Sequence, residues 1–341
     1  MSISHGVKKL GVLGAGQMGL GIAYVAALRA KVDVLIYDKS TEQIERGLKL
    51  MDKLIAKDVA NGKIVDHDAQ AARARVTVVP QERGFAGLRD VDMVVEAVSE
   101  NLSLKQKMFG SLAQELHPNA ILASNTSSIS ITKIAAATIP PNLSAASEKG
   151  KATASRVVGL HFFNPVPKLV ELISALQTSK ETLGRARAFA IACGKEVTTS
   201  KDVPGFVSNA LLMPFINEKN VNTGNHVSRK RYGFARRYRH YPKTGDEPSY
   251  GSITARIGLD TCLAIQQTLY QGTGDSKYRP SVLLERMVDA QWYGRKNGGN
   301  VPGSEKGYAI WAGRVAEFAF PEISSTLVAM PYNDSSGPNG R

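Results

Sequence analysis

The sequence predicts an α/β protein: a Rossmann-type N-terminal domain with a mainly parallel sheet, followed by a smaller all-α C-terminal domain that is partly disrupted. Over the first two hundred residues short apolar runs alternate with helical patterns, as in βαβ units. A glycine-rich turn, Gly14–Gly19, follows directly on the first of these runs. We expect the sheet domain at 1–201, the helical domain at 202–300 with an interruption at about 219–256, and an irregular tail at 301–341.

Eight segments are predicted strands because they are short, apolar and bounded by turn residues: Lys9–Leu13, Val32–Tyr37, Val76–Val79, Met93–Ala97, Ile121–Ser124, Val157–Leu160, Leu169–Ile173 and Glu196–Thr199. Helical patterns fill the gaps and return near the C-terminus: Met18–Arg29, Thr41–Asn61, Leu104–Leu116, Ile131–Ala137, Glu181–Cys193, Ile257–Tyr270 and Ser281–Ala290. The stretch from Ile44 to Ala74 is long, charged and helical, so we expect it to project as a helical pair.

The composition is that of a globular protein. The chain has 341 residues, 43% hydrophobic and 21% charged, and no stretch approaches 18 uninterrupted apolar residues. The first strand begins close to the N-terminus, so we expect no signal or transit peptide and a cytoplasmic location, with the mitochondrial matrix as the alternative. Cys193 and Cys262 lie far apart, which indicates reduced thiols and predicts no metal site.

The net charge of +13 raises the question of nucleic-acid binding. Between Lys219 and Arg256, nine Lys/Arg stand against two Asp/Glu, so about half of the excess lies in one short segment. The remaining charge is spread out and suits an anionic cofactor and substrate. We therefore expect neither nucleic acid nor a membrane as the partner.

Two passages have the composition of loops. Asn142–Ser155 is rich in Ser, Ala, Lys and Gly, and we expect a flexible surface loop at the N-terminal end of the next strand, remote from the ligand crevice. Asn220–Ser252 is basic and has no helical or alternating apolar period. Burial there cannot offset the roughly 1–2 kcal/mol per residue of backbone ordering, so we expect it to be unpacked and cut early by trypsin.

The glycine-rich turn predicts a dinucleotide site. Gly14, Gly16 and Gly19 have G-x-G-x-x-G spacing, with Gln17 and Met18 between them. Such glycines permit the tight turn, the approach of the pyrophosphate and close helix–strand packing. Asp38 ends the second strand, nineteen residues past Gly19, where a carboxylate can accept hydrogen bonds from the ribose hydroxyls and repels a 2′-phosphate. NAD is therefore predicted over NADP; the alternative is a glycine-rich turn that binds nothing.

Two predicted strands end in polar residues that can carry chemistry. One ends at Ser124 and is followed by Asn125–Ser128, and the other ends at His161. In a parallel sheet both ends point to the same edge, where a histidine can act as a base because its pKa lies near neutrality. Glu171, two residues into the next strand, can orient the imidazole. A structural histidine and a solvated carboxylate are the alternatives on position alone.

Three motifs resemble those of the L-3-hydroxyacyl-CoA dehydrogenases: Ser-Asn-Thr-Ser-Ser at 124–128, His-Phe-Phe-Asn-Pro-Val-Pro at 161–167 and Asp-Val-Pro-Gly-Phe-Val-Ser-Asn at 202–209. The resemblance runs from about Lys8 to Glu218 and returns at Ile257–Asn297. It implies NAD-dependent oxidation of L-3-hydroxyacyl-CoA to 3-oxoacyl-CoA, and the reverse, in fatty-acid metabolism such as β-oxidation. It also implies homodimers formed through the C-terminal domain.

The same resemblance implies roles for individual residues. His161 would take the proton of the 3-hydroxyl group, and Glu171 would orient His161. Ser127 and Asn209 would hydrogen-bond the oxygen functions of the substrate. The other implied contacts are with the cofactor and the coenzyme A tail: Glu100 and Lys105 on the nicotinamide ribose side, Asn164 near the carboxamide, and Lys57 and Lys63 along the tail.

The chain departs from the family pattern at three places. The family usually has two further residues between Pro167 and Lys168. Two residues preserve strand parity, so Glu171 can still face the same way if its strand slides, and without sliding it loses roughly 7 Å of reach. Asn142–Ser155 is longer than its family counterpart. After Glu218 the family's helices are absent until Ile257, and the pattern fails again after Asn297, which suggests a shifted frame or misplaced splice boundaries. We therefore expect a chain that is monomeric, poorly stable, or both.

Other functions remain open at the level of sequence. The same residues could oxidise a free 3-hydroxy acid, such as a sugar acid, which would not need the helical pair. A catalytically impaired dinucleotide-binding scaffold would bind the cofactor without turnover. Arg229–Lys243 interleaves arginine with aromatic residues, as in single-strand nucleic-acid binders, whose binding weakens steeply with salt.

Overall fold

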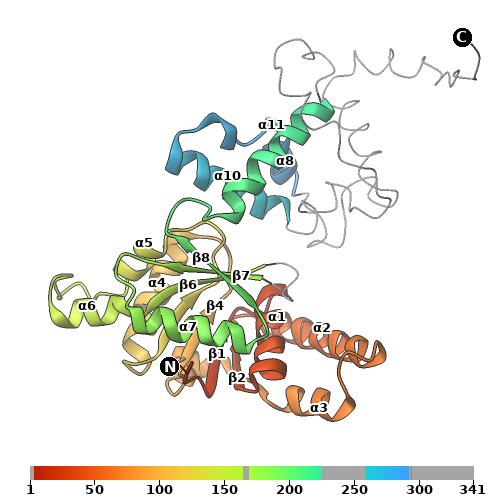
Figure 1. The fold of residues 1–341 in the computed structure, drawn as a ribbon, viewed down its shortest axis with the longest axis vertical. Coiled ribbons are helices and arrows are strands. Elements are labelled where there is room, and N and C mark those ends of the chain that lie inside the picture. Colours follow the sequence, from red (N-terminus) through yellow and green to blue (C-terminus); the bar gives the residue numbers. More distant parts are fainter. Residues whose placement is uncertain (1–3, 164–168, 225–257, 292, 294–341) are drawn as a thin grey trace, which may run out of the picture. The chain divides into compact units, whose positions relative to one another are not determined.

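The computed structural model describes residues 4–163, 169–224, 258–291 and 293 (Figure 1). By packing, the chain falls into two compact units. The first comprises Met1–Leu211 and Gln267–Asp275, and the second comprises Leu212–Gln266 and Ser276–Arg341. The predicted division of the chain after residue 201 stays a prediction.

The first unit is built on an eight-stranded sheet with the order β3-β2-β1-β4-β5-β6-β7-β8. Every neighbouring pair is parallel except β6 and β7, so the predicted mainly parallel sheet is confirmed. All eight predicted strands form, with small differences at their ends: β1 Lys9–Leu13, β2 Asp33–Tyr37, β3 Val76–Val78, β4 Met93–Glu96, β5 Ile121–Ser124, β6 Val157–Phe162, β7 Leu169–Ser174 and β8 Glu196–Lys201.

Helices connect the strands: α1 Gln17–Val25 with a π-helical turn η1 at Ala26–Ala30, α2 Thr41–Ala60, α3 Asp66–Ala74, the 3-10 segment η2 Gln81–Leu88, α4 Leu102–Glu115, α5 Ile131–Ala136, α6 Glu148–Ser155 and α7 Lys180–Ala192. The predicted helical pair is confirmed as α2 and α3 (Figure 1). The first helix was predicted to run on to Arg29, but its regular part ends at Val25 and the π-helical turn closes in the left-handed residue Lys31.

The prediction of a loop throughout Asn142–Ser155 was wrong in its second half, which forms α6. The hydroxyl of Ser147 caps this helix by accepting the backbone N–H of Gly150 at 3.0 Å. Composition misled because Ser, Lys and Gly are common in loops, whereas a serine at the N-cap and alanines in the following turns favour a helix. As expected, α6 precedes the N-terminal end of β6.

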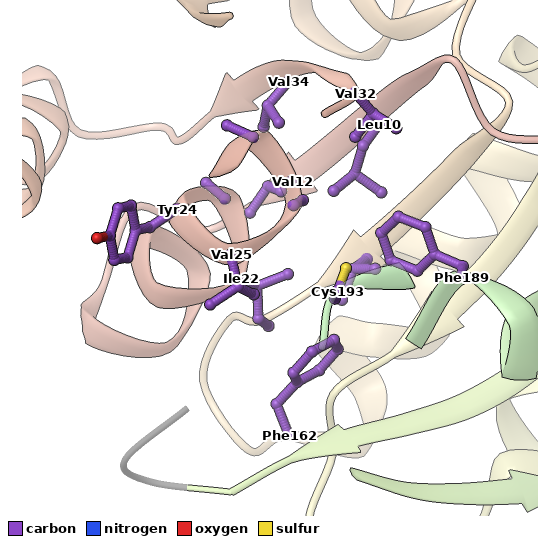
Figure 2. Packing of buried hydrophobic residues seen from close by; sticks show 14 of the residues in the cluster. Leu10, Val12, Ile22, Tyr24, Val25, Val32, Val34, Phe162, Phe189 and Cys193 are labelled. Atoms are coloured by element: carbon purple, nitrogen blue, oxygen red, sulfur yellow. The ribbon is translucent and has the colours of Figure 1, made fainter. Parts of the chain in front are cut away.

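The central strands β4, β5 and β6 are buried on both faces, as a parallel sheet between helical layers requires. Alternate residues of the central strands point to opposite layers: Met93 and Val95 pack into one cluster, and Val94 packs into the other. Figure 2 shows the first cluster, where strand residues such as Val12 meet Ile22 of α1 and Phe189 of α7. The other layer is formed by α4, α5 and η2, with residues such as Leu88, Phe109 and Ile134.

The described thiols are packing residues. Cys193 lies in the first cluster (Figure 2). Cys262 is also buried, and neither cysteine forms a disulfide. Burial raises the pKa of the Cys193 thiol to about 12, so at neutral pH it is an unreactive thiol rather than a thiolate.

Arg156 binds the C-terminal end of α4, one of the helices of the second layer. Its guanidinium donates to the carbonyl oxygen of Ala113, in the last turn of α4, at 2.6 Å, and to that of His117, two residues beyond the helix, at 2.8 Å. Burial lowers the pKa of Arg156, but the helix C-terminus favours its charge. The contact is a structural one, at the N-terminal edge of the sheet, where β6 begins.

The second unit contains the later part of α8 Ser208–Gly224 together with α11 Val282–Asp289, and α10 Leu259–Thr273 is shared between the units. Both predicted C-terminal helices are thus confirmed. Residues 220–224 complete α8, although no helical pattern was recognised there, and 225–252 lie outside the described residues. So do 229–243, 164–168 and the tail 294–341. In the part of the chain that the structure describes, no helix is both long and apolar enough to span a membrane.

Candidate active site

The glycine-rich turn lies where the strand order reverses, between β1 and β4, and its conformation explains two of its glycines. Gly14 has φ +97°, and a Cβ there would stand 2.6 Å from the carbonyl oxygen of Ala97. A Cβ on Gly19 would stand 1.8 Å from the carbonyl oxygen of Gly14. Neither position can therefore carry a side chain without a shift of the backbone.

Gly16 differs, because the protein itself leaves room there. A Cβ on Gly16 would have no neighbour nearer than Gln43 Nε2 at 3.9 Å, so packing within the chain does not require this glycine. A bound group that approaches the backbone from outside would require it. Gly16 is also the N-cap of α1, with no side-chain cap and no acidic residue in the first turn, which leaves the helix N-terminus open to an anion.

Asp38 closes this part of the site. Its carboxylate accepts the backbone N–H of Ala15 at 2.8 Å and that of Ser40 at 2.9 Å, so it lies against the glycine turn at the end of β2. Gln17, exposed, and Met18, half-buried, begin α1 beside it. The open Gly16, the uncapped helix and the carboxylate fit the pyrophosphate and ribose of a dinucleotide such as NAD.

The polar loop after β5 is organised by Glu100. One oxygen of this carboxylate accepts hydrogen bonds from Thr126 Oγ1 at 2.6 Å, Ser127 N at 2.9 Å and Ser128 N at 3.2 Å. Ser127 Oγ donates to the same oxygen at 3.1 Å. Desolvation raises the pKa of Glu100, but the charge of Lys105 and these hydrogen bonds outweigh it, so its pKa is lowered and it is a carboxylate at neutral pH.

Lys105 is 1% exposed, with its ammonium between Glu96 Oε1 at 2.5 Å and Glu100 Oε2 at 3.6 Å. A group that touches a ligand is exposed when the ligand is removed, so this geometry makes Lys105 a partner of the two carboxylates. Its predicted contact with the cofactor stays a prediction, and so does that of Glu100.

Two amide side chains tie the loop to neighbouring elements. Asn125 Oδ1 accepts the backbone N–H of Phe162, at the end of β6, at 2.7 Å. Asn209 Nδ2, at the start of α8, donates to the carbonyl oxygen of Ser127 at 2.8 Å. The structure thus brings together Ser127 and Asn209, which the sequence predicted to share one substrate.

His161 and Glu171 form a buried pair. They face each other directly across the antiparallel strands β6 and β7, and His161 Nδ1 lies 3.0 Å from Glu171 Oε2. The imidazole also packs against the rings of Phe163 and Phe206, with centroids at 4.6 and 6.2 Å. Glu171 therefore reaches His161 in this register, and the loss of roughly 7 Å of reach expected for a strand that does not slide does not occur.

The first turn of α8 holds the other oxygen of Glu171. Oε1 accepts the backbone N–H groups of Val207 at 3.2 Å and Ser208 at 3.0 Å, at the positive end of the helix. Burial alone would raise the pKa of Glu171, but the hydrogen bond and charge of His161 and these backbone donors outweigh it, so its pKa is lowered. The alternative of a solvated carboxylate is wrong, since Glu171 is fully buried.

Sequence reasoning missed this helix terminus and the left-handed turn that precedes it. Gly205 and Phe206 have φ +70° and +54°, and this turn aims the two backbone donors at Glu171. The glycine in Asp202–Phe206 was the available signal, since glycine is common before such a change of direction. Asp202 caps a different helix, α5, by accepting the N–H groups of Ile131 at 2.9 Å and Thr132 at 2.7 Å.

The remaining predicted residues are placed in part. Lys57 is exposed in the last turn of α2, and Lys63 lies just beyond that helix with its ammonium 3.2 Å from Asp58. Their contact with coenzyme A stays a prediction. Asn164 lies outside the described residues. Among the residues that the structure describes, no group of His, Cys, Asp and Glu could hold a metal ion.

Comparison with known proteins gives a consistent result over both units. A family model described as 3-hydroxyacyl-CoA dehydrogenase, NAD binding domain, matches residues 9–203, and one described as its C-terminal domain matches residues 252–302. The chain is 40% identical over 294 residues to a 3-hydroxybutyryl-CoA dehydrogenase of Bradyrhizobium diazoefficiens, covering 85% of this chain and 93% of the relative. It is 40% identical over 296 residues to a probable 3-hydroxybutyryl-CoA dehydrogenase of Bacillus subtilis, covering 86% and 96%.

Solved structures agree. The (S)-3-hydroxybutyryl-CoA dehydrogenase of Ralstonia eutropha superposes with a TM-score of 0.69 at 35% identity, covering 86% of this chain and 97% of that one. FadB2 of M. tuberculosis superposes with a TM-score of 0.70 at 32% identity, covering 86% and 98%.

Proposed function

The chain belongs to the 3-hydroxyacyl-CoA dehydrogenase family, and on that premise we propose that it oxidises 3-hydroxyacyl-CoA to 3-oxoacyl-CoA with NAD, and catalyses the reverse, with His161 as the base. The observation that carries this assignment is the buried pair of His161 and Glu171 beside the polar loop, at the same sheet edge as the glycine turn. The relatives are named for 3-hydroxybutyryl-CoA, and we extend the proposal to a short acyl chain as the preferred substrate.

His161 removes the proton of the 3-hydroxyl group as the carbinol carbon loses its hydride. Nδ1 faces Glu171, so Nε2 is the nitrogen that accepts this proton. The imidazolium that forms lies beside a carboxylate that is held ionised by α8, which stabilises the positive charge at the moment it develops. In the reverse direction the same nitrogen returns the proton to the carbonyl oxygen.

Ser127 and Asn209 are proposed to hold the oxygen functions of the substrate. Asn209 uses one N–H on the carbonyl of Ser127 and keeps its second N–H and its amide oxygen for a ligand. The hydroxyl of Ser127 points to Glu100 and can rotate to donate elsewhere. The tether between the two residues fixes them relative to each other before substrate binds, which lowers the entropic cost of orienting it.

NAD, when bound, supplies the acceptor for the hydride. Gly14, Gly16 and the first turn of α1 would hold its pyrophosphate, and Asp38 its adenosine ribose. Glu100 and Asn164 are proposed to contact the nicotinamide side, and Lys105, buried between Glu96 and Glu100, is proposed to act there through Glu100. These assignments are supported by the fit of the glycine turn and by the family match to an NAD binding domain.

The test is an assay with acetoacetyl-CoA in which the oxidation of NADH is monitored through its absorbance. We expect turnover with the thioester and little with free acetoacetate. Turnover on the free acid would instead favour a dehydrogenase of free 3-hydroxy acids. Cofactor binding without turnover on either substrate would favour the scaffold and would overturn the proposal.

Replacing Asp38 separates two effects of its carboxylate. Asp38→Ala should weaken NAD binding and relax the preference against NADP, because the ribose acceptor, the hydrogen bond to Ala15 and the repulsion of a 2′-phosphate are all lost. Asp38→Asn is the matched control, since it keeps an acceptor and loses only the charge. Titrations of both variants with both cofactors measure this. A parent that already binds NADP as tightly as NAD would contradict the assignment.

We further propose that the chain is a monomer in a reducing, intracellular compartment. The absence of the family pattern between Glu218 and Ile257 and again after Asn297 supports a monomer, because the resemblance implied dimer contacts in that domain. Two buried cysteines that form no disulfide support a reducing compartment. Light scattering should give the mass of one 36.7 kDa chain at micromolar concentration, and a mass of two chains would be the contrary result.

A further inference from the structure

Glu96 lies between the two halves of the candidate active site. It is the last residue of β4 and is fully buried. In the sheet it pairs with Leu13 of β1, which leads into the glycine turn, and with Ser124 of β5, which leads into the polar loop. The sequence predicted no role for Glu96, because this residue ends a buried apolar strand and its partners are distant in sequence.

In the part of the chain that the structure describes, this carboxylate hydrogen-bonds to groups that shape the site. Oε1 accepts Lys105 Nζ at 2.5 Å and the backbone N–H of Val98 at 2.8 Å. Oε2 accepts Ser124 Oγ at 2.6 Å. Glu96 therefore joins the start of the polar loop to α4, which carries Lys105, and to the exit of its own strand.

Lys105 links Glu96 to Glu100. Its ammonium is shared by the two carboxylates, and Glu100 in turn accepts the side chain of Thr126 and the backbone N–H groups of Ser127 and Ser128. Without Glu96, the ammonium would be free to move toward Glu100, and Ser124 would lose its acceptor. The polar loop would then lose the contact of Ser124 with Glu96 and the indirect contact with Glu96 through Lys105 and Glu100. These are two of the contacts that set its position.

Stability alone does not account for the pair. Removing two charges from water is costly, and well-packed apolar residues of similar volume generally stabilise a fold as well or better. Ion pairs of this kind are useful where a geometry has to be fixed. Here the geometry that they fix is that of the loop beside His161.

We infer that Glu96 is a positioning residue for the dehydrogenase reaction, acting through Lys105 and Glu100 on the loop Ser124–Ser128. The inference rests on the proposed function for its kinetic part. Its structural part concerns the chain alone, and amide hydrogen exchange of the cofactor-free protein tests it independently.

The first experiment uses Glu96→Gln, which keeps the shape and removes the charge. Amide exchange at Ser127 and Ser128 should accelerate by roughly tenfold or more in the cofactor-free protein, because Glu100 no longer holds them in one position. kcat/KM for acetoacetyl-CoA should fall by about 10- to 10²-fold, as expected when a reacting geometry is misplaced. Arg156→Met is the matched control: it removes a buried polar contact at the opposite edge of the sheet and should leave both readouts unchanged per folded molecule.

The second experiment separates positioning from the neutralisation of Lys105. The double variant Glu96→Leu with Lys105→Met removes both buried charges, so the stability lost in Glu96→Gln should return. We expect fast exchange at Ser127 and Ser128 and low kcat/KM to persist. Recovery of slow exchange and parental kcat/KM together with stability would overturn the inference, and so would parental exchange in Glu96→Gln. If the parent has no turnover on acetoacetyl-CoA, the proposed function fails, while the exchange measurement still decides the role of Glu96.

Discussion

His161→Gln should lower kcat for acetoacetyl-CoA reduction by roughly 10²- to 10⁴-fold, the usual cost of losing a general acid or base. The imidazole is the group whose Nε2 can take up or release a proton while Nδ1 is held by Glu171. Glutamine keeps a hydrogen-bonding group of similar reach at this position but cannot exchange the proton. A single-turnover experiment with saturating substrate, in which the absorbance of NADH is followed, measures the rate of the chemical step.

Cofactor binding should be unaffected by this change, because His161 lies at the end of β6 and the glycine turn follows β1. A fluorescence titration with NADH checks this. His67→Gln is the matched control, since His67 is a side chain exposed on α3 and far along the chain from the site. A His161 variant with the kcat of the parent would remove His161 from the mechanism.

The second large effect is expected at Glu171. Glu171→Gln should reduce kcat by roughly 10²- to 10⁴-fold, because the imidazolium loses its counter-charge and the tautomer of His161 is no longer fixed. KM should change little, since Glu171 is fully buried and lies behind the histidine. Steady-state kinetics that give the loss in KM rather than in kcat would contradict this role.

Asp202→Asn provides a close control for the Glu171 variant. Both carboxylates accept two backbone N–H groups at a helix N-terminus, and only Glu171 also touches His161. Both variants should therefore lose stability in urea, but only the Glu171 variant should lose kcat. Equal kinetic losses would indicate that helix capping, and not the contact with histidine, explains the effect.

The lowered pKa of Glu171 also makes stability depend on pH. Its folded-state pKa lies below the ordinary value of 4.5, so the unfolded chain binds more protons in the window below that value. The contribution of Glu171 is therefore present above about pH 4.5 and is lost as the pH falls through the folded-state pKa. Urea unfolding at a series of acidic pH values should show a shallower decline for Glu171→Gln than for the parent. Glu100, whose pKa is also lowered, keeps part of the slope in the variant.

The sequence by itself determined the sheet domain, because its elements are local. Each apolar run or helical pattern reflects the burial of one strand or one helix face, so it is visible in a short stretch of sequence. All eight strands form within a few residues of their predicted ends. The glycine turn and Asp38 were predicted for the same reason: the conformations they need are visible in a short stretch of chain. Composition failed where local signals conflict, as in the capped helix α6.

Only the tertiary structure decided how the site is held together. The sequence offered Glu171 as a partner for His161 but left its reach open; the antiparallel pairing of β6 and β7 sets the two opposite each other. The two N–H groups of α8 on Glu171, and the contacts of Glu96 with Lys105 and Ser124, join residues from different strands and helices. No periodicity records such contacts, because they depend on which strands are neighbours in the sheet, and a buried carboxylate reveals its purpose only through the donors that surround it.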